Sequence, residues 1–372
     1  MSTTRPRPTW IPFLALLVAT AATARTAPLA RPGAAGARTA YVCELFGGTV
    51  SVVDLDRLAW RRDLAVGPYP VFAALAPHDS TRLLVTLHNY GREEDGDALI
   101  AVDRDAAADS GAAVIVARVG WPGPGMPSGF VFDPRRDRLY IADENLHCVH
   151  VHDATSLAWL FDLPAGLVPV HVALSPDARR LVVTNRKSAD LTVYDLDRPR
   201  VEARDGIGVL HLGAAPRGDW TPGAGDSTAV SHPLDVHFAR DTALCYVTDM
   251  TRNALLVVDL ERWMVTARVP LAASPFDFAV DRAGALAYVC LYGGDSVAVV
   301  DLATRRVVRT IGGFGAHPMH CALDEDAGRL VVTCWGDDRS GSVHVVDLKA
   351  DRPPVRVAVP GAKASIGLAL AR

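Results

Sequence analysis

The sequence lacks the motifs from which many catalytic and cofactor-binding sites are built. Its six cysteines form no CxxC or CxxCH pair, which disfavours a cysteine-cluster zinc site and covalently bound haem. It also has no GxSxG, HExxH, Walker, dinucleotide-binding or EF-hand motif. Nothing therefore supports a serine hydrolase of the nucleophile-elbow type, a phosphate-transfer enzyme or a nicotinamide-dependent enzyme.

Lysines and aromatic residues are scarce as well. The 372 residues include three lysines and no basic run, and aromatic residues make up 7% of the chain. A surface without basic patches is a poor match for nucleic acid, so we expect no nucleic-acid partner. Hydrophobic residues account for 49% and charged residues for 22%, a composition that predicts a large packed core rather than a disordered chain.

The first 39 residues differ from the rest of the chain. Arg5 and Arg7 precede an apolar stretch at 11–22, and Ala22-Thr23-Ala24 has the small-x-small form of a cleavage site. We predict a signal peptide at 1–24, a flexible tether at 25–39 and a periplasmic or secreted protein. The alternative is an uncleaved anchor, but the apolar stretch is short for a membrane span. We therefore expect no stable membrane span after cleavage. Cleavage would also remove two arginines and no acidic residue, and so change the formal net charge from −4 to −6.

The strongest pattern is a repeat. Seven apolar, β-like segments each end on an aspartate, and successive aspartates are 42 to 64 residues apart, the length of one four-stranded unit. The seven aspartates are Asp54, Asp103, Asp153, Asp195, Asp259, Asp301 and Asp347. Within one repeat, at 169–195, a proline-led strand is followed by a Ser-Pro-Asp turn, a β-branched strand, a polar loop and a third strand.

Three segments carry a family resemblance. Tyr246-Val247-Thr248-Asp249, Val182-Val183-Thr184-Asn185 and Tyr41-Val42-Cys43-Glu44 are each followed by a V-D-L strand or a variant of it. The pattern resembles the YVTN-type (YncE-like) β-propeller repeat family over about residues 40–372. The resemblance implies a propeller fold and says little about activity, because related propellers serve many purposes.

We therefore predict an all-β, seven-bladed β-propeller with four-stranded blades, forming a single domain at 40–372. The segment that begins at Tyr41 matches a second strand, and the segment at 365–370 matches a first strand. The C-terminal strand should thus join the N-terminal blade and close the ring, which removes the open ends of the array.

The cysteines allow two interpretations. Cys43 and Cys290 lie at equivalent places in apolar strands, where buried free thiols are expected. An oxidising compartment also allows disulfides, and Cys321 and Cys334, which flank one hairpin, are then the expected pair.

The proline that starts each first strand provides a register for comparing the blades. Two residues after it, four consecutive blades place His171, Asp235, Asp277 and His320, which should lie near the channel. Two imidazoles and two carboxylates would suit one divalent metal ion. The alternative is that these groups bind channel water and neighbouring backbone.

Further candidates gather on the face that carries the longest loops. They are polar and aromatic residues at the ends of the second strands, together with two histidines that precede a proline. These side chains could bind a protein, glycan or small-molecule ligand. The candidates are Glu44, His88, Glu144, Asn185, Arg186, His232, Asp249, Tyr292, His317 and Trp335. His150 and His152, by contrast, lie on a third strand, where packing or surface placement is expected.

Three functions remain open from the sequence. The first is an exported scaffold that binds a ligand or partner on its loop-rich face. The second is a metal-dependent enzyme of lactonase or lyase type that uses the histidine and aspartate ring. The third, implied by resemblance to propellers of periplasmic amine dehydrogenases and of copper or haem reductases, is a redox-partner subunit, although the missing haem motif argues against it.

Overall fold

The computed structural model describes most of the propeller region. The described residues are 38–88, 97–104, 113–121, 124–198, 207–212, 231–240 and 242–371. They belong to one compact unit, Ala37–Arg372. The predicted signal peptide and all of the predicted tether except its last two residues lie outside the described residues, as do most of the longest loops.

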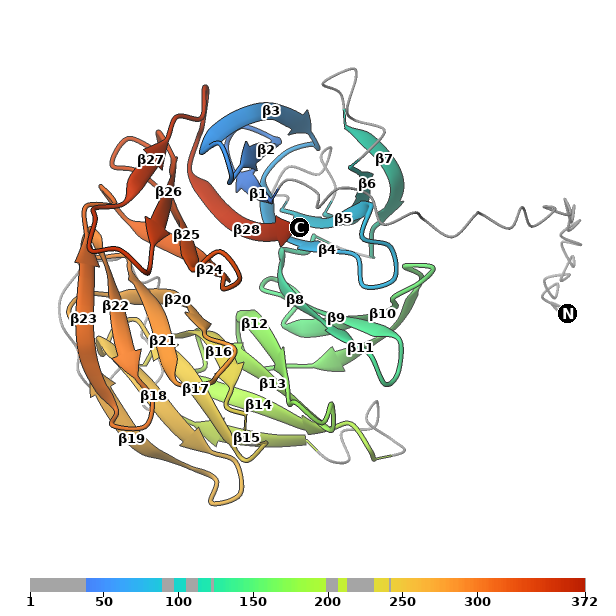
Figure 1. Ribbon diagram of the computed structural model, residues 1–372. Coiled ribbons are helices and arrows are strands. Elements are labelled where there is room, and N and C mark those ends of the chain that lie inside the picture. The colour runs from blue at the N-terminus through green and yellow to red at the C-terminus, as the bar shows by residue number, and fades with distance from the viewer. Residues whose placement is uncertain are drawn as a thin grey trace, which may run out of the picture. The chain divides into compact units, whose positions relative to one another are not determined.

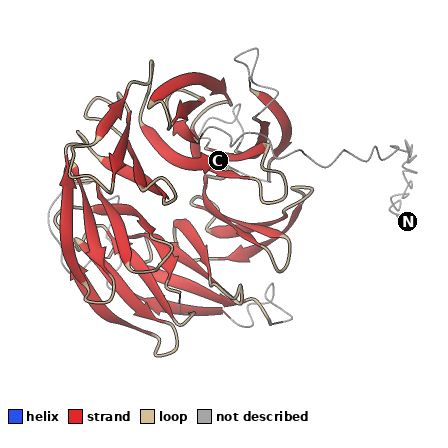
Figure 2. Ribbon diagram, in the orientation of Figure 1, coloured by secondary structure: helices blue, strands red, loops and turns tan. Residues whose placement is uncertain are grey.

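The described chain consists of strands, turns and loops, and no helix occurs in it (Figure 2). The strands β1 to β28 form seven four-stranded antiparallel sheets, arranged as blades around a central channel (Figure 1). The prediction of a seven-bladed β-propeller is therefore confirmed.

Each blade runs from an innermost strand at the channel to an outer strand at the rim (Figure 1). The innermost strands are β28 (Ser365–Ala371), β4 (Pro70–Leu75), β8 (Pro127–Asp133), β12 (Pro169–Leu174), β16 (Pro233–Phe238), β20 (Pro275–Val280) and β24 (Pro318–Asp324). The second strands are β1 (Thr39–Glu44), β5 (Arg82–Leu87), β9 (Arg138–Asp143), β13 (Arg180–Asn185), β17 (Leu244–Asp249), β21 (Leu286–Leu291) and β25 (Arg329–Cys334).

The repeated aspartates end the third strands, as the period predicts. These strands are β2 (Thr49–Asp54), β6 (Ala98–Asp103), β10 (Cys148–Asp153), β14 (Asp190–Asp195), β18 (Ala254–Asp259), β22 (Ser296–Asp301) and β26 (Ser342–Asp347). The outer strands are β3 (Ala59–Ala65), β7 (Val114–Val119), β11 (Trp159–Pro164), β15 (Ile207–His211), β19 (Met264–Pro270), β23 (Arg306–Gly312) and β27 (Val355–Val357).

The core lies between neighbouring blades. Second and third strands are buried along almost their whole length because both of their faces pack against adjacent sheets. One such cluster joins Tyr140 and Val149 of the third blade to Val183 and Tyr194 of the fourth. The outer strands are edge strands, and they expose apolar residues such as Val308.

The C-terminal strand closes the ring, as predicted. β28 pairs antiparallel with β1, from Thr39 opposite Ala371 to Glu44 opposite Ser365. The buried Glu44 carboxylate accepts hydrogen bonds from Ser365 Oγ and from the backbone N–H of Lys363, each at 2.9 Å. Burial raises the pKa of Glu44 to about 7, even though these hydrogen bonds favour its charged form. Glu44 of β1 therefore stabilises the position of the closing strand β28 through these hydrogen bonds.

All six cysteines are buried and unpaired. The expectation of a Cys321–Cys334 disulfide is wrong. In the pairing of β24 with β25, Cys321 lies opposite Val332 and Cys334 opposite Pro318, so the two cysteines are not cross-strand partners. Each thiol instead donates a hydrogen bond to a different carbonyl.

Candidate functional site

The innermost strands begin with a bulge. In β12 the pairing register shifts between Pro169 and His171. The backbone N–H of His171 donates to Thr184 Oγ1 at 3.1 Å, and that hydroxyl donates to the carbonyl of Leu234 in the next blade at 2.6 Å. A bulge re-aims the side chain that follows it, here toward the channel. The same N–H to threonine bond recurs in the pairs Phe72–Thr86, Asp235–Thr248 and His320–Thr333.

The threonine of the YVTN-like motif thus has a structural role. The hydroxyls of Thr184 and Thr248 each accept the N–H of a bulge residue in their own blade and donate to a carbonyl oxygen of the next blade. Glycine replaces the channel-facing residue where blades approach closely: a Cβ at Gly129 would lie 2.3 Å from the His171 ring. Gly129 therefore makes room for that histidine.

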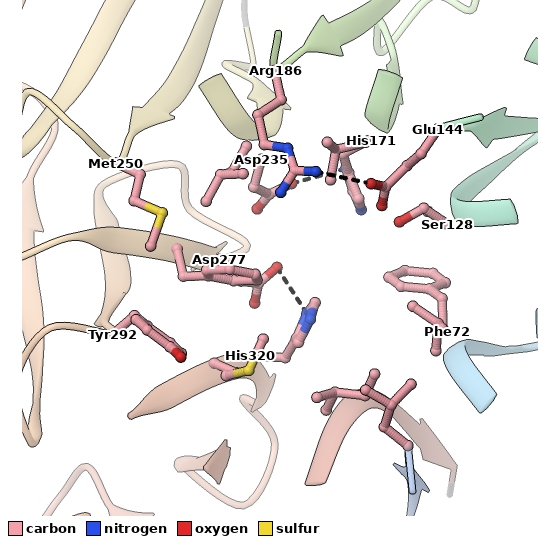
Figure 3. Close-up of a pocket in the computed structure, with 18 of the residues that line it drawn as sticks. Phe72, Ser128, Glu144, His171, Arg186, Asp235, Met250, Asp277, Tyr292 and His320 are labelled. Carbon is pink, nitrogen blue, oxygen red and sulfur yellow. Dashed lines mark hydrogen bonds and ion pairs between the residues drawn. The ribbon is translucent and has the colours of Figure 1, made fainter. Parts of the chain in front are cut away.

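The channel mouth contains a cavity of about 370 Å³ (Figure 3). The four residues predicted to ring the channel all line it, and so do five predicted ligand-binding residues: His88, Glu144, Arg186, Tyr292 and Trp335. Apolar and aromatic side chains form much of the remaining wall, including Leu45, Phe72, Met126, Leu234, Met250, Phe276, Met319 and Ile366. An apolar cavity with a few converging polar groups is typical of a small-molecule site.

On one side of the channel, Asp235 lies between two imidazoles. His171 Nδ1 is 2.8 Å from Asp235 Oδ1, and His237 Nε2 is 3.2 Å from Oδ2. Oδ2 also accepts the backbone N–H of Phe278 at 3.2 Å. Burial alone would raise the pKa of Asp235, but the two imidazoles outweigh it and hold that pKa well below its usual range. Asp235 is therefore a carboxylate at neutral pH.

The equivalent residue of the next blade, Asp277, has a single imidazole partner. His320 Nδ1 is 3.4 Å from Asp277 Oδ1, and the backbone N–H of Cys321 donates to Oδ2 at 2.8 Å. Burial raises the pKa of Asp277, His320 offsets this only in part, and the charge of Asp235 adds to the rise. Burial would lower the pKa of His320, but Asp277 raises it overall.

These four residues therefore form two pairs, on β12 with β16 and on β20 with β24, rather than one closed ring (Figure 3). Each carboxylate oxygen that faces a histidine is already engaged by it. A single metal ion bound by all four groups would require both pairs to open.

A third charged pair lies near the rim of the cavity. Arg186 Nη2 is 3.2 Å from Glu144 Oε2 (Figure 3). Burial raises the pKa of Glu144 in spite of Arg186. The nearby His88 is buried, which lowers its pKa to about 4, so it is a neutral imidazole at pH 7.

Aromatic rings cover the Asp277 side of the mouth. Phe276 packs at 5.8 Å from Tyr292 and at 5.7 Å from His320, measured between ring centroids. His317 stacks on Tyr292 at 4.6 Å, and its Nδ1 is 2.7 Å from the Tyr292 carbonyl. His317 therefore supports the wall from behind and does not line the cavity.

The remaining predicted residues hold the loops around the mouth. Asn185 Nδ2 donates to Asp190 Oδ1 and to Thr192 Oγ1, both at 2.8 Å. Asp249 accepts a hydrogen bond from the backbone N–H of His232 at 3.1 Å. Asn185, Asp249, His232 and Glu44 are all buried, and none of them lines the cavity.

Sequence reasoning missed His237. It lies two residues after Asp235 on β16, and both side chains contact each other. Residues i and i+2 of a strand share a face, so the spacing Asp-x-His was a usable signal. It also missed the apolar wall, because methionines and leucines on buried strands have no distinguishing pattern.

Comparison of the sequence with protein-family models gives no match, and comparison with curated proteins gives none either. The fold is similar to that of a functionally unknown protein from Desulfotomaculum acetoxidans DSM 771, with a TM-score of 0.67 and 14% sequence identity. The match covers 90% of this chain and 99% of the other. At this identity the likeness concerns the fold alone. In the described residues no helix has the length and apolar character to cross a bilayer.

Proposed function

We propose that the channel mouth binds a small organic ligand that has an apolar or aromatic body and a basic amine. The carrying observation is that buried carboxylates from neighbouring blades and a wall of aromatic rings meet in one cavity of about 370 Å³. The wall would hold the body of the ligand, and the carboxylates would hold its charged end.

The charges favour a cation over an anion. Three carboxyl groups line the cavity, those of Glu144, Asp235 and Asp277, against one guanidinium, that of Arg186, and the two aspartate-paired imidazoles of His171 and His320. Arg186 and Glu144 already pair with each other, and Asp235 is paired with histidines. Asp277 is the least compensated, since burial raises its pKa. An ammonium group beside Asp277 would supply the missing charge, and the rings of Phe276 and Tyr292 would favour it further.

The test uses matched probes, phenethylamine, phenylacetate and 2-phenylethanol, titrated into the full-length protein by isothermal calorimetry. We expect the amine to bind at least tenfold more tightly than the acid or the alcohol. Asp277→Asn should remove this preference and leave the weak binding of the alcohol unchanged. Equal binding of the three probes, or a preference for the acid, would refute the proposal.

A second candidate is acid–base catalysis. It is favoured by one observation: the pKa values of Asp235 and Asp277, at equivalent positions, are shifted in opposite directions. Such divergence separates a base from an acid. Turnover of a lactone panel that is lost in both Asp235→Asn and Asp277→Asn would support it, and retained turnover in both variants would remove these residues from any reaction.

We also propose that the chain is an exported, YVTN-type propeller located in the periplasm or secreted. The proposal rests on Arg5 and Arg7, on the apolar stretch at 11–22 that follows them, and on the YVTN-like segments. Intact-mass analysis of the exported fraction should give a chain starting near Arg25. A full-length chain retained in the membrane fraction would contradict it. Binding of a protein or glycan to the loop-rich face remains a prediction, and no described feature favours a redox-partner role.

A further inference from the structure

A separate cluster of metal-ligating side chains lies in the third blade. Cys148 and His150 are two residues apart on β10 and share one face of the strand. Asp162 of β11 lies directly opposite His150, and Asp143 of β9 lies directly opposite Cys148. Three adjacent strands thus bring a thiol, an imidazole and two carboxylates together.

The distances suit a small ion. Ligand atoms of Cys148, His150 and Asp162 all lie within 4.8 Å of one another. Cys148 Sγ is 3.8 Å from His150 Nδ1, and Nδ1 is 2.7 Å from Asp162 Oδ1. In a tetrahedral zinc site these separations would be about 3.5 Å and about 3.3 Å. Cys148 Sγ is also 3.9 Å from Nε2, so the thiol lies beside the whole ring. An ion at Nδ1 therefore requires the Nδ1–Oδ1 separation to lengthen by about 0.6 Å and the thiol to turn toward Nδ1.

The imidazole is oriented by a further carboxylate. His150 Nε2 is 3.2 Å from Asp143 Oδ2. Asp143 is itself fixed, because it accepts the backbone N–H groups of Met126 at 3.0 Å and Leu146 at 2.8 Å. A carboxylate behind the histidine is the usual outer partner of a metal-bound imidazole. Trp121 stacks on the His150 ring at 4.4 Å and fixes its plane.

The first blade provides an internal comparison. There, Trp60 Nε1 donates to Asp63 Oδ1 at 2.9 Å, just as Trp159 Nε1 donates to Asp162 Oδ1 at 2.8 Å. The residue opposite Asp63 is Ser51, in the place that His150 occupies. The tryptophan–aspartate contact is thus shared by the first and third blades. The seventh blade has His344 at the position of His150 but Ser342 in place of Cys148, so the thiol, the imidazole and the aspartate come together in the third blade.

We propose that Cys148, His150 and Asp162 bind a zinc ion. Cys148 Sγ, His150 Nδ1 and an Asp162 oxygen supply three ligands, and His150 Nε2–H donates to Asp143. Thiolate, imidazole and carboxylate together are a ligand set that zinc accepts. When the ion binds, the Cys148 thiol and the His150 Nδ1–H that faces Asp162 each lose a proton to solvent, while Nε2–H stays hydrogen-bonded to Asp143. Asp162 is 42% exposed, so the ion has a path from solvent and the fourth position is open to water.

Cobalt(II) provides a direct test, because a thiolate ligand gives a charge-transfer band in the near ultraviolet. Full-length protein is treated with chelator, freed of it, and titrated with Co²⁺ and then Zn²⁺. We expect a saturable band with one ion per chain, which Zn²⁺ abolishes. Cys148→Ser should eliminate the band, and Asp162→Asn should weaken Co²⁺ binding at least tenfold.

Two control variants separate this site from the rest of the protein. Cys245→Ser removes another buried thiol, and His320→Ala removes a channel histidine, and both should keep the band. If Cys148→Ser does not fold, Asp162→Asn alone decides, since its side chain is half-exposed. Absence of the band in the wild type, its persistence in Cys148→Ser, or full affinity in Asp162→Asn would overturn the proposal.

Discussion

The two sides of the channel mouth differ in chemistry although they are built alike. Asp235 and Asp277 both lie two residues after the first proline of an innermost strand, and both are buried. Asp235 contacts two imidazoles, whereas Asp277 contacts one, at a longer distance. Their pKa values are consequently shifted in opposite directions. The repeat determines where a carboxylate lies, and its neighbours determine its charge.

One residue accounts for much of this difference. The strand of Asp235 has the sequence Pro-Leu-Asp-Val-His-Phe, and the strand of Asp277 has Pro-Phe-Asp-Phe-Ala-Val. His237 in the first strand therefore corresponds to Ala279 in the second. Exchanging these two residues should therefore reverse the difference, and either single change should make the two sides more alike.

The largest expected effect comes from removing the charge of Asp235. Asp235→Asn leaves His237, whose pKa Asp235 raises, without its buried counter-ion and removes the contact to His171, so we expect the free energy of unfolding to fall by about 3 kcal/mol or more at pH 7. Asp277→Asn should cost about 1 kcal/mol, because a group with a raised pKa loses little when its charge is removed. Urea denaturation measures both values. Equal losses would show that the two aspartates have the same charge state.

The next effect is on the pH dependence of stability. The raised pKa values of Asp277 and His320 mean that their stabilising contribution is complete at low pH and is lost as pH rises through their folded values. Asp277→Asn removes this loss, so the stability of the variant relative to the wild type should increase as pH rises from about 4 to about 7. Denaturation at a series of pH values tests the sign. If the stability of Asp277→Asn relative to the wild type decreased as pH rises, the raised pKa of Asp277 would be contradicted.

His237→Ala should make Asp235 resemble Asp277. With one imidazole left, the pKa of Asp235 should rise, and stability at pH 7 should fall by about 1–2 kcal/mol, a charged hydrogen bond being lost. The matched control is His211→Ala, because His211 is an exposed histidine on an outer strand. Unchanged stability in both variants would show that His237 does not stabilise the Asp235 carboxylate.

The reciprocal change, Ala279→His, should have the smallest effect. A second imidazole beside Asp277 should lower the pKa of that carboxyl group. The pKa of His320, which Asp277 raises, should then be raised by a smaller amount. We expect a change in stability of about 1 kcal/mol or less, since the added ring must also fit a half-buried position. Loss of amine binding in this variant would agree with an Asp277 already compensated by protein. Undiminished amine binding would argue against Asp277 as the ammonium partner.

The sequence allowed the fold to be predicted, and with it the strand positions that face the channel, for one physical reason. Blades contact mainly their neighbours, and the repeats share local signals: an aspartate ends all seven third strands, a proline begins six innermost strands and a threonine recurs in four second strands. The register of the channel residues follows from the prolines. That register put His171, Asp235, Asp277 and His320 near the channel, and in the structure all four line the cavity.

The charge states and several assignments could not be predicted because they depend on distant segments. Asp235 accepts an N–H from Phe278, and Glu44 accepts hydrogen bonds from residues more than three hundred positions away. The role of Glu44 in ring closure follows from that contact and not from its own repeat. The cluster of Cys148, His150 and Asp162 likewise depends on pairing across β9, β10 and β11.

The most direct measurement is a ¹³C NMR titration of the aspartate side-chain carboxyl groups, assigned with Asp235→Asn and Asp277→Asn. We predict that Asp277 titrates above the usual aspartate pKa of about 3.9 and Asp235 well below it. Saturating phenethylamine should lower the pKa of Asp277 and leave that of Asp235 nearly unchanged. Both groups titrating together, or in the opposite order, would contradict the account, as would a pKa of Asp277 that does not respond to the amine.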